Sequence, residues 1–209
     1  MGNAHNRLAL IGAGPMGLAA AKLLVEQGID FQGFELNSDV GGLWDIDGPR
    51  STMYETAHLI SSKKMTEFTD FPMREEVAEY PSHREMKTYF QEFALHFDLA
   101  KHYNFGAEVL SCVPMGGSGD GWQITWRDDL GEHQENFAGL LIANGTLSTP
   151  NMPSFKGEFS GELVHSSQYR YPSQFSGKRV LIVGAGNSGC DIAVDAIHHG
   201  TSTDLSMRR

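Results

Sequence analysis

Two glycine-rich stretches have the spacing that binds the pyrophosphate of a dinucleotide. They are IGAGPMG at residues 11–17 and VGAGNSG at residues 183–189. In a G-x-G-x-x-G motif the first glycine permits a tight turn, the second lets the pyrophosphate approach the backbone, and the third lets the next helix pack on the strand. That helix offers free N–H groups and a partial positive charge to the phosphates. The glycines concerned are Gly12, Gly14, Gly17, Gly184, Gly186 and Gly189.

An acidic residue sets the ribose chemistry expected at the first motif. Residues 31–34 are predicted to form the next strand, and Glu35 follows them directly. A carboxylate there accepts hydrogen bonds from ribose hydroxyls and repels a 2′-phosphate, so this site is predicted to hold FAD or NAD and not NADP. The alternative is a chance glycine turn with Glu35 as a solvated strand end.

Basic residues take the corresponding place after the second motif. The strand expected at residues 205–207 is followed by Arg208 and Arg209. A guanidinium pairs with a 2′-phosphate and stacks on adenine, which favours NADPH. The alternative is a pair of solvated arginines. Two sites of opposite ribose chemistry predict a flavin oxidoreductase in which a reduced nicotinamide feeds a hydride to the flavin.

Hydrophobic periodicity and turn residues predict the elements that hold these motifs. Residues 8–11 form an apolar strand before the first glycine turn, and a helical pattern follows it. Ser82 and Glu85 form a capping box for a second helix. The turn DDLG at residues 128–131 joins two alternating segments and predicts an antiparallel hairpin, and residues 140–143 predict a buried strand. The expected core face of the second helix comprises Met86, Tyr89, Phe90, Phe93 and Phe97.

The elements together predict an α/β protein. A Rossmann-like FAD-binding domain with a β-meander insertion is expected over residues 1–150, a linker over 151–177, and the start of a second Rossmann-like, NADP-binding domain over 178–209. Two strands and one helix cannot bury their own apolar faces. We therefore expect this chain to be the N-terminal part of a longer protein.

Composition narrows the partners and the compartment. The formal net charge of −10 argues against nucleic acid or an anionic membrane as partner, and no apolar run is long enough to span a bilayer. Cys112 and Cys190 stand alone, which fits a reducing cytoplasm, and the nine histidines lack the spacing of a metal site. No metal is expected. A homodimer is left open.

The segment between the motifs resembles a known family. FSGELVHSSQY matches F-x-G-x-x-x-H-x-x-x-Y, the fingerprint of the flavin-containing monooxygenases of class B, and GAGPMG, GGLW, SSKKM, NGTLSTPNMP and GAGNSGCDIA resemble the family in the same order. The resemblance spans essentially the whole chain. The fingerprint residues are Phe159, Gly161, His165 and Tyr169.

The resemblance implies a specific chemistry. NADPH reduces FAD, the flavin forms a C4a-hydroperoxide with O₂, and one oxygen passes to a soft nitrogen or sulfur, or to a ketone. His165 and its neighbours are implied to link the domains. The implied FAD contacts are Gly12, Gly14, Pro15, Met16, Gly17, Glu35, Gly42, Leu43, Trp44 and Ser61. The implied NADP contacts are Gly184, Gly186, Asn187, Ser188, Gly189, Cys190, Asp191 and Arg208.

One departure from the family pattern affects the candidate catalytic residues. Many members carry T-N-S-S-K-E-M, whose Asn steadies the nucleotide, and the matching stretch here places Ile60 at that position. His58 is two residues earlier and shares a face with Ile60 on an extended segment, so His58 and Ser61 are the expected catalytic residues. This pattern resembles the type II subgroup, with relaxed NADH/NADPH choice and Baeyer–Villiger activity. The alternative is that His58 is an ordinary loop residue.

Two other functions compete with a monooxygenase. A disulfide reductase of the two-dinucleotide type needs a redox cysteine pair, and the sequence has no C-x-x-C. A catalytically incompetent nucleotide-binding fragment, acting as an interaction module, is favoured by Ile60 and by the short second unit.

Overall fold

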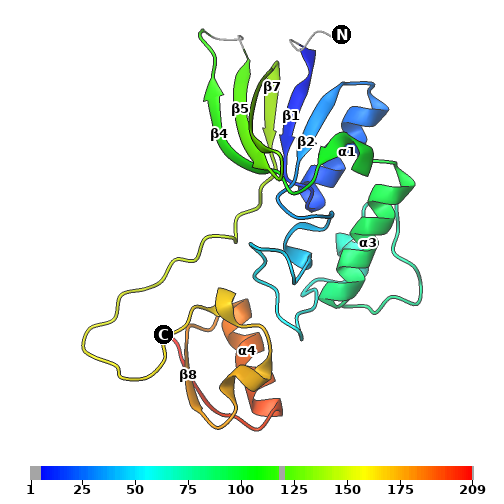
Figure 1. Ribbon diagram of the computed structural model, residues 1–209. Coiled ribbons are helices and arrows are strands. Elements are labelled where there is room, and N and C mark those ends of the chain that lie inside the picture. The colour runs from blue at the N-terminus through cyan, green and yellow to red at the C-terminus, as the bar shows by residue number, and fades with distance from the viewer. Residues whose placement is uncertain (1–5, 118–120, 209) are drawn as a thin grey trace.

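Residues 8–142 form a parallel sheet with helices on one face and a small antiparallel sheet on the other. The computed structural model describes residues 6–117 and 121–208 (Figure 1). Four parallel strands lie in the order β3-β2-β1-β7. Their bounds are Leu8–Ile11 for β1, Phe31–Phe34 for β2, Tyr103–Asn104 for β3 and Gly139–Ile142 for β7.

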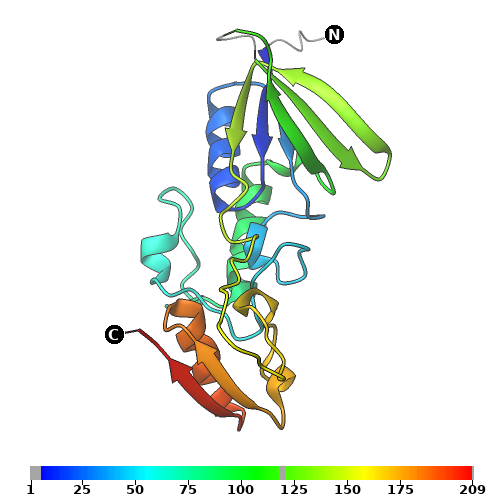
Figure 2. The same cartoon turned by 90° about the vertical axis from the view of Figure 1, so that its left-hand side faces the viewer.

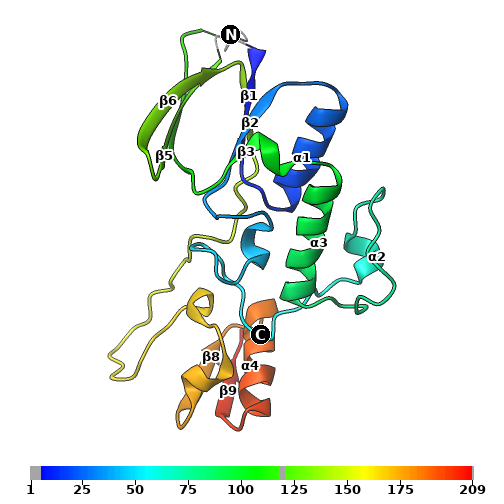
Figure 3. The ribbon, with the colours of Figure 1, turned by 45° about the vertical axis from the view of Figure 1, so that its right-hand side comes forward.

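Alternating side chains of the parallel strands build two separate cores. Leu10 points to one face and packs with the helices α1 (Pro15–Glu26) and α3 (His83–His96). Ala9 and Phe34 belong to the core on the opposite face. That face is covered by an antiparallel sheet in the order β4-β5-β6, with bounds Glu108–Pro114, Trp122–Asp128 and Gly131–Phe137 (Figure 3). This antiparallel sheet is the expected meander, inserted between β3 and β7.

The capping box predicted for α3 is present. The Ser82 hydroxyl accepts from the Glu85 N–H at 3.3 Å, and the Glu85 carboxylate accepts from the Ser82 N–H at 2.8 Å. Of the expected core face, Phe97 is the one member that lies beyond the helix end, where it caps the last turn and is only partly buried. The buried members are Met86, Tyr89, Phe90 and Phe93.

The strand expected to be buried at residues 140–143 is an edge strand. β7 pairs with β1 on one side only, and Ile142 is 65% exposed. The prediction of burial was therefore wrong for the end of this strand, because no other described strand pairs with its free edge. The short helix α2 (Lys63–Thr66) and the strands β3 and β4 were not predicted.

A second strand–helix–strand unit lies beyond an irregular segment. It consists of β8 (Arg179–Val183), α4 (Asn187–His198) and β9 (Ser202–Ser206), with the two strands parallel. Residues 143–165 contain no helix or strand and run along the outside of the molecule (Figures 1 and 2). As expected for so small a unit, apolar residues of β8 and β9 remain uncovered: Leu181 and Leu205 are 63% and 41% exposed.

Candidate functional site

The first glycine turn is held by close backbone contacts. The Gly12 N–H donates to the Phe34 carbonyl at 2.8 Å, and Gly12 has φ of +101°. A Cβ on Gly17 would lie 1.8 Å from the Gly12 carbonyl oxygen, whereas one on Gly14 would meet only the Gly42 Cα, at 3.5 Å. The first and third glycines therefore serve the turn itself, and the second leaves room above the backbone.

The amino end of α1 is open to an anion. Gly14 is its N-cap residue, no side chain caps it by a hydrogen bond, and Pro15 occupies the first turn. Met16 is 73% exposed at the same end. The N–H groups of the first turn and the helix dipole are thus available to a phosphate.

Glu35 is buried beside this turn. Its side chain is 7% exposed, and its two carboxylate oxygens accept from the N–H groups of Ala13 at 2.6 Å and Asn37 at 2.8 Å. Burial raises the pKa of Glu35, and these hydrogen bonds oppose that rise. A carboxylate has about four acceptor positions, so acceptor capacity remains for ribose hydroxyls. The alternative of a solvated strand end is excluded.

The GGLW stretch lies against the glycine turn. Gly41 donates its N–H to the Ala13 carbonyl at 3.0 Å, and a Cβ on Gly42 would lie 2.9 Å from the Gly14 Cα. Gly42–Trp44 forms a short 3₁₀ helix, and Trp44 packs partly on the main core. The backbone of this stretch therefore forms a wall beside the open end of α1.

His58 and Ser61 lie on an extended segment that runs beside residues 79–83. Leu59 is 7% exposed and its N–H donates to the Pro81 carbonyl at 2.7 Å, whereas Ile60 is 62% exposed. His58 is exposed like Ile60, as the alternation predicts. The two candidate side chains bond separately: His58 Nδ1 lies 3.3 Å from the Thr56 carbonyl, and Ser61 Oγ lies 2.8 Å from Thr66 Oγ1.

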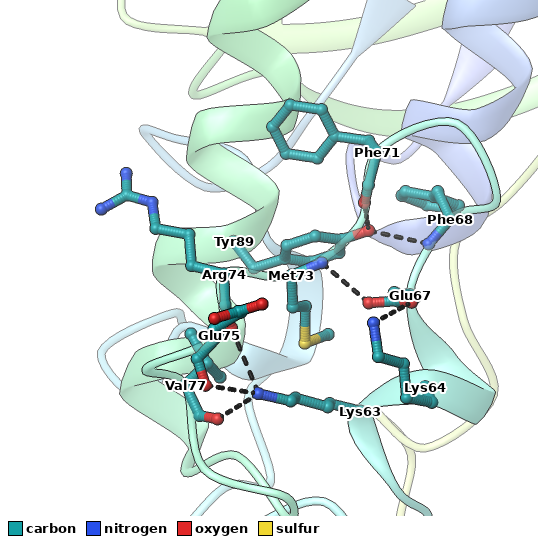
Figure 4. A network of polar contacts seen from close by, with 10 residues as sticks. All are labelled: Lys63, Lys64, Glu67, Phe68, Phe71, Met73, Arg74, Glu75, Val77 and Tyr89. Carbon is teal, nitrogen blue, oxygen red and sulfur yellow. Dashed lines mark hydrogen bonds and ion pairs between the residues drawn. The ribbon is translucent and has the colours of Figure 1, made fainter.

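Lys63 anchors this segment and was not predicted. Its side chain is 9% exposed, and its Nζ donates to three backbone carbonyls (Figure 4). These belong to Arg74 at 3.2 Å, Glu75 at 2.9 Å and Val77 at 2.5 Å. The neighbouring Lys64 is instead exposed and pairs with Glu67 at 3.2 Å. Sequence offers no signal that separates the two lysines.

The second glycine turn repeats the geometry of the first. The Gly184 N–H donates to the Ser206 carbonyl at 2.8 Å, as Gly12 does to Phe34. A Cβ on Gly189 would lie 2.1 Å from the Gly184 oxygen, whereas Gly186 has open space. Gly186 is the N-cap residue of α4 and no side chain caps this helix by a hydrogen bond. The other predicted contacts in its first turn are Asn187, Ser188 and the exposed Cys190.

The strand register shows which residue of the second unit corresponds to Glu35. Ile11 pairs with Phe34, and Val183 pairs with Ser206. Met207 therefore corresponds to Glu35, and the exposed Arg208 follows one residue later. Arg209 lies outside the described residues.

Carboxylates of α4 join the second unit to the first. The Tyr54 hydroxyl donates to Asp191 Oδ2 at 2.9 Å, and Thr56 donates to Asp195 Oδ2 at 2.9 Å. The Tyr169 hydroxyl also donates to Asp195. Asp191, which was predicted to contact NADP, therefore accepts a hydrogen bond from Tyr54 through its carboxylate.

The fingerprint residues have different surroundings. Tyr169 is 2% exposed and packs between Tyr54 and α4, whereas Phe159 is 75% exposed. His165 Nδ1 accepts from the Ser167 N–H at 3.1 Å and so caps a short turn. A Cβ on Gly161 would lie 2.4 Å from the Phe159 ring. The fingerprint joins the two units mainly through its tyrosine.

Candidate metal centres and candidate membrane helices are both absent from the part of the chain that the structure describes. In residues 6–117 and 121–208, no group of three or more His, Cys, Asp and Glu side chains is arranged to hold a metal ion. Within the same residues, no helix combines the length and apolar character needed to cross a bilayer.

The fold and the two turns define the class: an α/β protein with two strand–glycine turn–helix units, the first interrupted by a β-meander. The family model of flavin-binding monooxygenase-like proteins matches residues 5–209. The chain belongs to this family.

Individual relatives agree with this assignment. Human flavin-containing monooxygenase 1 is 36% identical over 96% of this chain, and dimethylaniline monooxygenase [N-oxide-forming] 2 of Pan troglodytes is 35% identical over 97%. The chain spans 40% of the length of each of these curated relatives.

Solved structures are similar too. S-allyl-L-cysteine S-oxygenase from Allium sativum has a TM-score of 0.83 and 26% identity, and covers 92% of this chain and 48% of its own. OTEMO in complex with FAD and NADP has a TM-score of 0.72 and 28% identity, and covers 97% of this chain and 38% of its own.

Proposed function

We propose that this chain is the nucleotide-binding N-terminal part of an NAD(P)H- and FAD-dependent monooxygenase. The observation that carries the proposal is the pair of equivalent glycine turns, one beside a buried acid and the other beside an arginine. Glu35 and Arg208 stand at nearly corresponding places in the two units, so the units select different riboses. We further propose residues 1–150, 151–177 and 178–209 as FAD domain, linker and NADP domain.

The residues of the first turn fit FAD. The space above Gly14 and the uncapped end of α1 suit a pyrophosphate, and Glu35 suits ribose hydroxyls. Gly42, Leu43 and Trp44 supply backbone and a large apolar surface beside that turn. When bound, the flavin supplies hydride acceptance and oxygen activation.

The second turn fits a nicotinamide dinucleotide. Its pyrophosphate suits the open end of α4, over Gly186, Asn187 and Ser188. Arg208, exposed beside this turn, pairs with a 2′-phosphate and favours NADPH over NADH.

The proposed substrate is a small molecule with a soft nitrogen or sulfur, or a ketone, oxygenated with O₂. The names of similar proteins include an N-oxide-forming enzyme, an S-oxygenase and cyclohexanone monooxygenase, which supports this range and not one member of it. His58 is our candidate for the polar group that faces the reacting atoms, since the exposed Ile60 beside it cannot donate a hydrogen bond.

A second candidate function is a nucleotide-binding module without turnover. It is favoured by the apolar residues that β8 and β9 leave exposed, among them Leu181 and Val183 at 63% and 57%. Such a surface suits an interaction with another polypeptide.

Flavin binding and reduction test both candidates. The purified chain is incubated with FAD, freed of unbound nucleotide and examined for the visible absorbance of oxidised flavin. Anaerobic NADPH then bleaches that absorbance if the chain brings the two nucleotides together, and O₂ uptake without matching peroxide release shows oxygenation. Bound flavin that NADPH does not bleach favours the module. A colourless chain contradicts the proposal.

The affinity for FAD is expected to fall in acid because of Glu35. Burial raises the pKa of this carboxyl, and ribose hydroxyls that donate to the carboxylate lower that pKa on binding. Binding therefore releases a proton once the pH falls below the raised pKa, and affinity drops by up to about tenfold per pH unit there. Flavin fluorescence titrations from neutral pH downwards measure the slope. Glu35→Gln should bind FAD more weakly with a flatter profile; equal slopes contradict this role.

Arg208→Ala is expected to weaken NADPH binding and spare NADH. Loss of a charge-assisted contact to phosphate costs about 1.5–3 kcal/mol, which is about 10- to 150-fold in affinity. NADH lacks the 2′-phosphate, so its affinity should change less than threefold, a shift of about 0.6 kcal/mol. Isothermal titration with both nucleotides gives the ratio, and Arg179→Ala, an exposed arginine at the start of β8, is the control. An unchanged NADPH affinity would remove Arg208 from the site.

A further inference from the structure

Arg170 ties two distant segments together through carbonyl oxygens. The segments are residues 51–53, which precede the candidate catalytic stretch, and residues 167–169, which end the fingerprint. Its Nη2 donates to Ser51 at 2.7 Å, and its Nη1 donates to Met53 at 3.1 Å, Ser167 at 2.9 Å and Tyr169 at 3.1 Å. A planar guanidinium with five donors suits such a set of acceptors, and a lysine does not.

Ser51 carries this contact on to the first nucleotide site. The side chain is 6% exposed, and its Oγ donates to the Leu43 carbonyl at 2.6 Å. Leu43 belongs to the 3₁₀ helix that lies against the first glycine turn. Two hydrogen bonds, from Arg170 to Ser51 and from Ser51 to Leu43, therefore connect Arg170 to the 3₁₀ helix beside the first glycine turn.

The segment 51–57 also contacts the helix of the second proposed nucleotide site. The Glu55 N–H donates to the Arg170 carbonyl at 2.7 Å. The adjacent Tyr54 donates its hydroxyl to Asp191, in the N-terminal half of α4, at 2.9 Å. Residues 51–57 therefore contact the 3₁₀ helix Gly42–Trp44 of the proposed flavin site at one end and α4 of the proposed nicotinamide site at the other.

We propose that Arg170 and Ser51 are positioning residues that couple the two nucleotide sites. The inference rests on the proposed function. Residues 51–57 are already hydrogen-bonded without a nucleotide, and whichever nucleotide binds first restricts the motion that remains in them and bears that entropy cost, so the second nucleotide binds more tightly. The effect is reciprocal and is commonly 5- to 150-fold. Neither residue touches a nucleotide in this scheme; both act through the backbone of residues 41–57.

The coupling is measured by FAD titrations with and without saturating NADP⁺. NADP⁺ is expected to tighten FAD binding about tenfold in the wild-type chain. Ser51→Ala and Arg170→Met should bring that ratio close to one, although each chain still binds either nucleotide alone. Arg127→Met is the matched control, because Arg127 is exposed on β5, in the antiparallel sheet. Wild-type binding of both nucleotides without coupling overturns the inference.

Amide exchange in the unliganded chain gives a readout that needs no flavin. The N–H groups of Trp44 and Asp45 donate to the carbonyls of Gly41 and Gly42 at 3.2 and 3.3 Å. Their exchange rates therefore report on the stability of the 3₁₀ helix Gly42–Trp44. Their exchange should quicken in Ser51→Ala and Arg170→Met and stay unchanged in Arg127→Met.

The two readouts separate the inference from the proposed function. Absence of FAD binding together with the expected change in exchange contradicts the function and leaves the positioning role standing. FAD binding with unchanged exchange and an unchanged NADP⁺ effect overturns the positioning role alone. If Arg170→Met does not fold, Ser51→Ala decides, since it deletes a single hydroxyl.

Discussion

Gly12→Ala is expected to destabilise the chain by about 4 kcal/mol and to abolish FAD binding. The added Cβ would lie 2.5 Å from the Ala143 carbonyl oxygen, which belongs to the backbone and follows β7 directly. The φ of +101° is also one that a side chain disfavours, at a cost of about 1–2 kcal/mol. Overpacking against the backbone adds about 1–3 kcal/mol. Relief of the clash requires β7 to move away from β1, which opens the turn.

Chemical denaturation and retained flavin absorbance measure these two effects. Gly106→Ala is the matched control, because Gly106 also has positive φ, +66°, but has no atom within 4 Å of its added Cβ. The control therefore reports the conformational cost alone, about 1–2 kcal/mol, with FAD binding intact. Equal losses of stability in the two variants would show that Ala143 does not confine the turn.

The features predicted correctly are those in which a local pattern has one structural solution. A strand, three spaced glycines and a helix give the same turn wherever they occur, and the Gly17 and Gly189 contacts show this twice. The capping box of Ser82 and Glu85 is equally local, because both hydrogen bonds form within one turn. The position of Glu35 follows from the length of the strand before it.

The features that were missed depend on contacts between distant backbone groups. Arg170 donates to carbonyls of residues 51 and 53, and carbonyl oxygens carry no sequence signature. The two-residue strand β3 is recognisable only because it pairs with Gly33 and Phe34. The partial exposure of β7 likewise depends on what covers its outer edge, which a local apolar run does not reveal.

Lys63→Met is the second large effect, with an expected loss of about 3 kcal/mol of stability. The ammonium group is the donor to three carbonyls of the loop 74–77, and methionine fills its volume without donating. Each hydrogen bond to a charged donor contributes about 1.5–3 kcal/mol, and some of the freed carbonyls will recover water from the exposed side of the loop. Residues 74–77, and Ser61 two residues before Lys63, should then exchange and proteolyse faster.

Lys64→Met provides the matched control, because it makes the same chemical change one residue further along. The Lys64 side chain is 65% exposed, and its partner Glu67, at 12% exposed, keeps the hydrogen bond from the Met73 N–H, so loss of the ion pair should cost less than about 1 kcal/mol. Urea denaturation of both variants gives the difference. A difference near zero would mean that water replaces the ammonium at all three carbonyls. A difference of about 2 kcal/mol or more would show that the buried Lys63 stabilises the candidate catalytic segment.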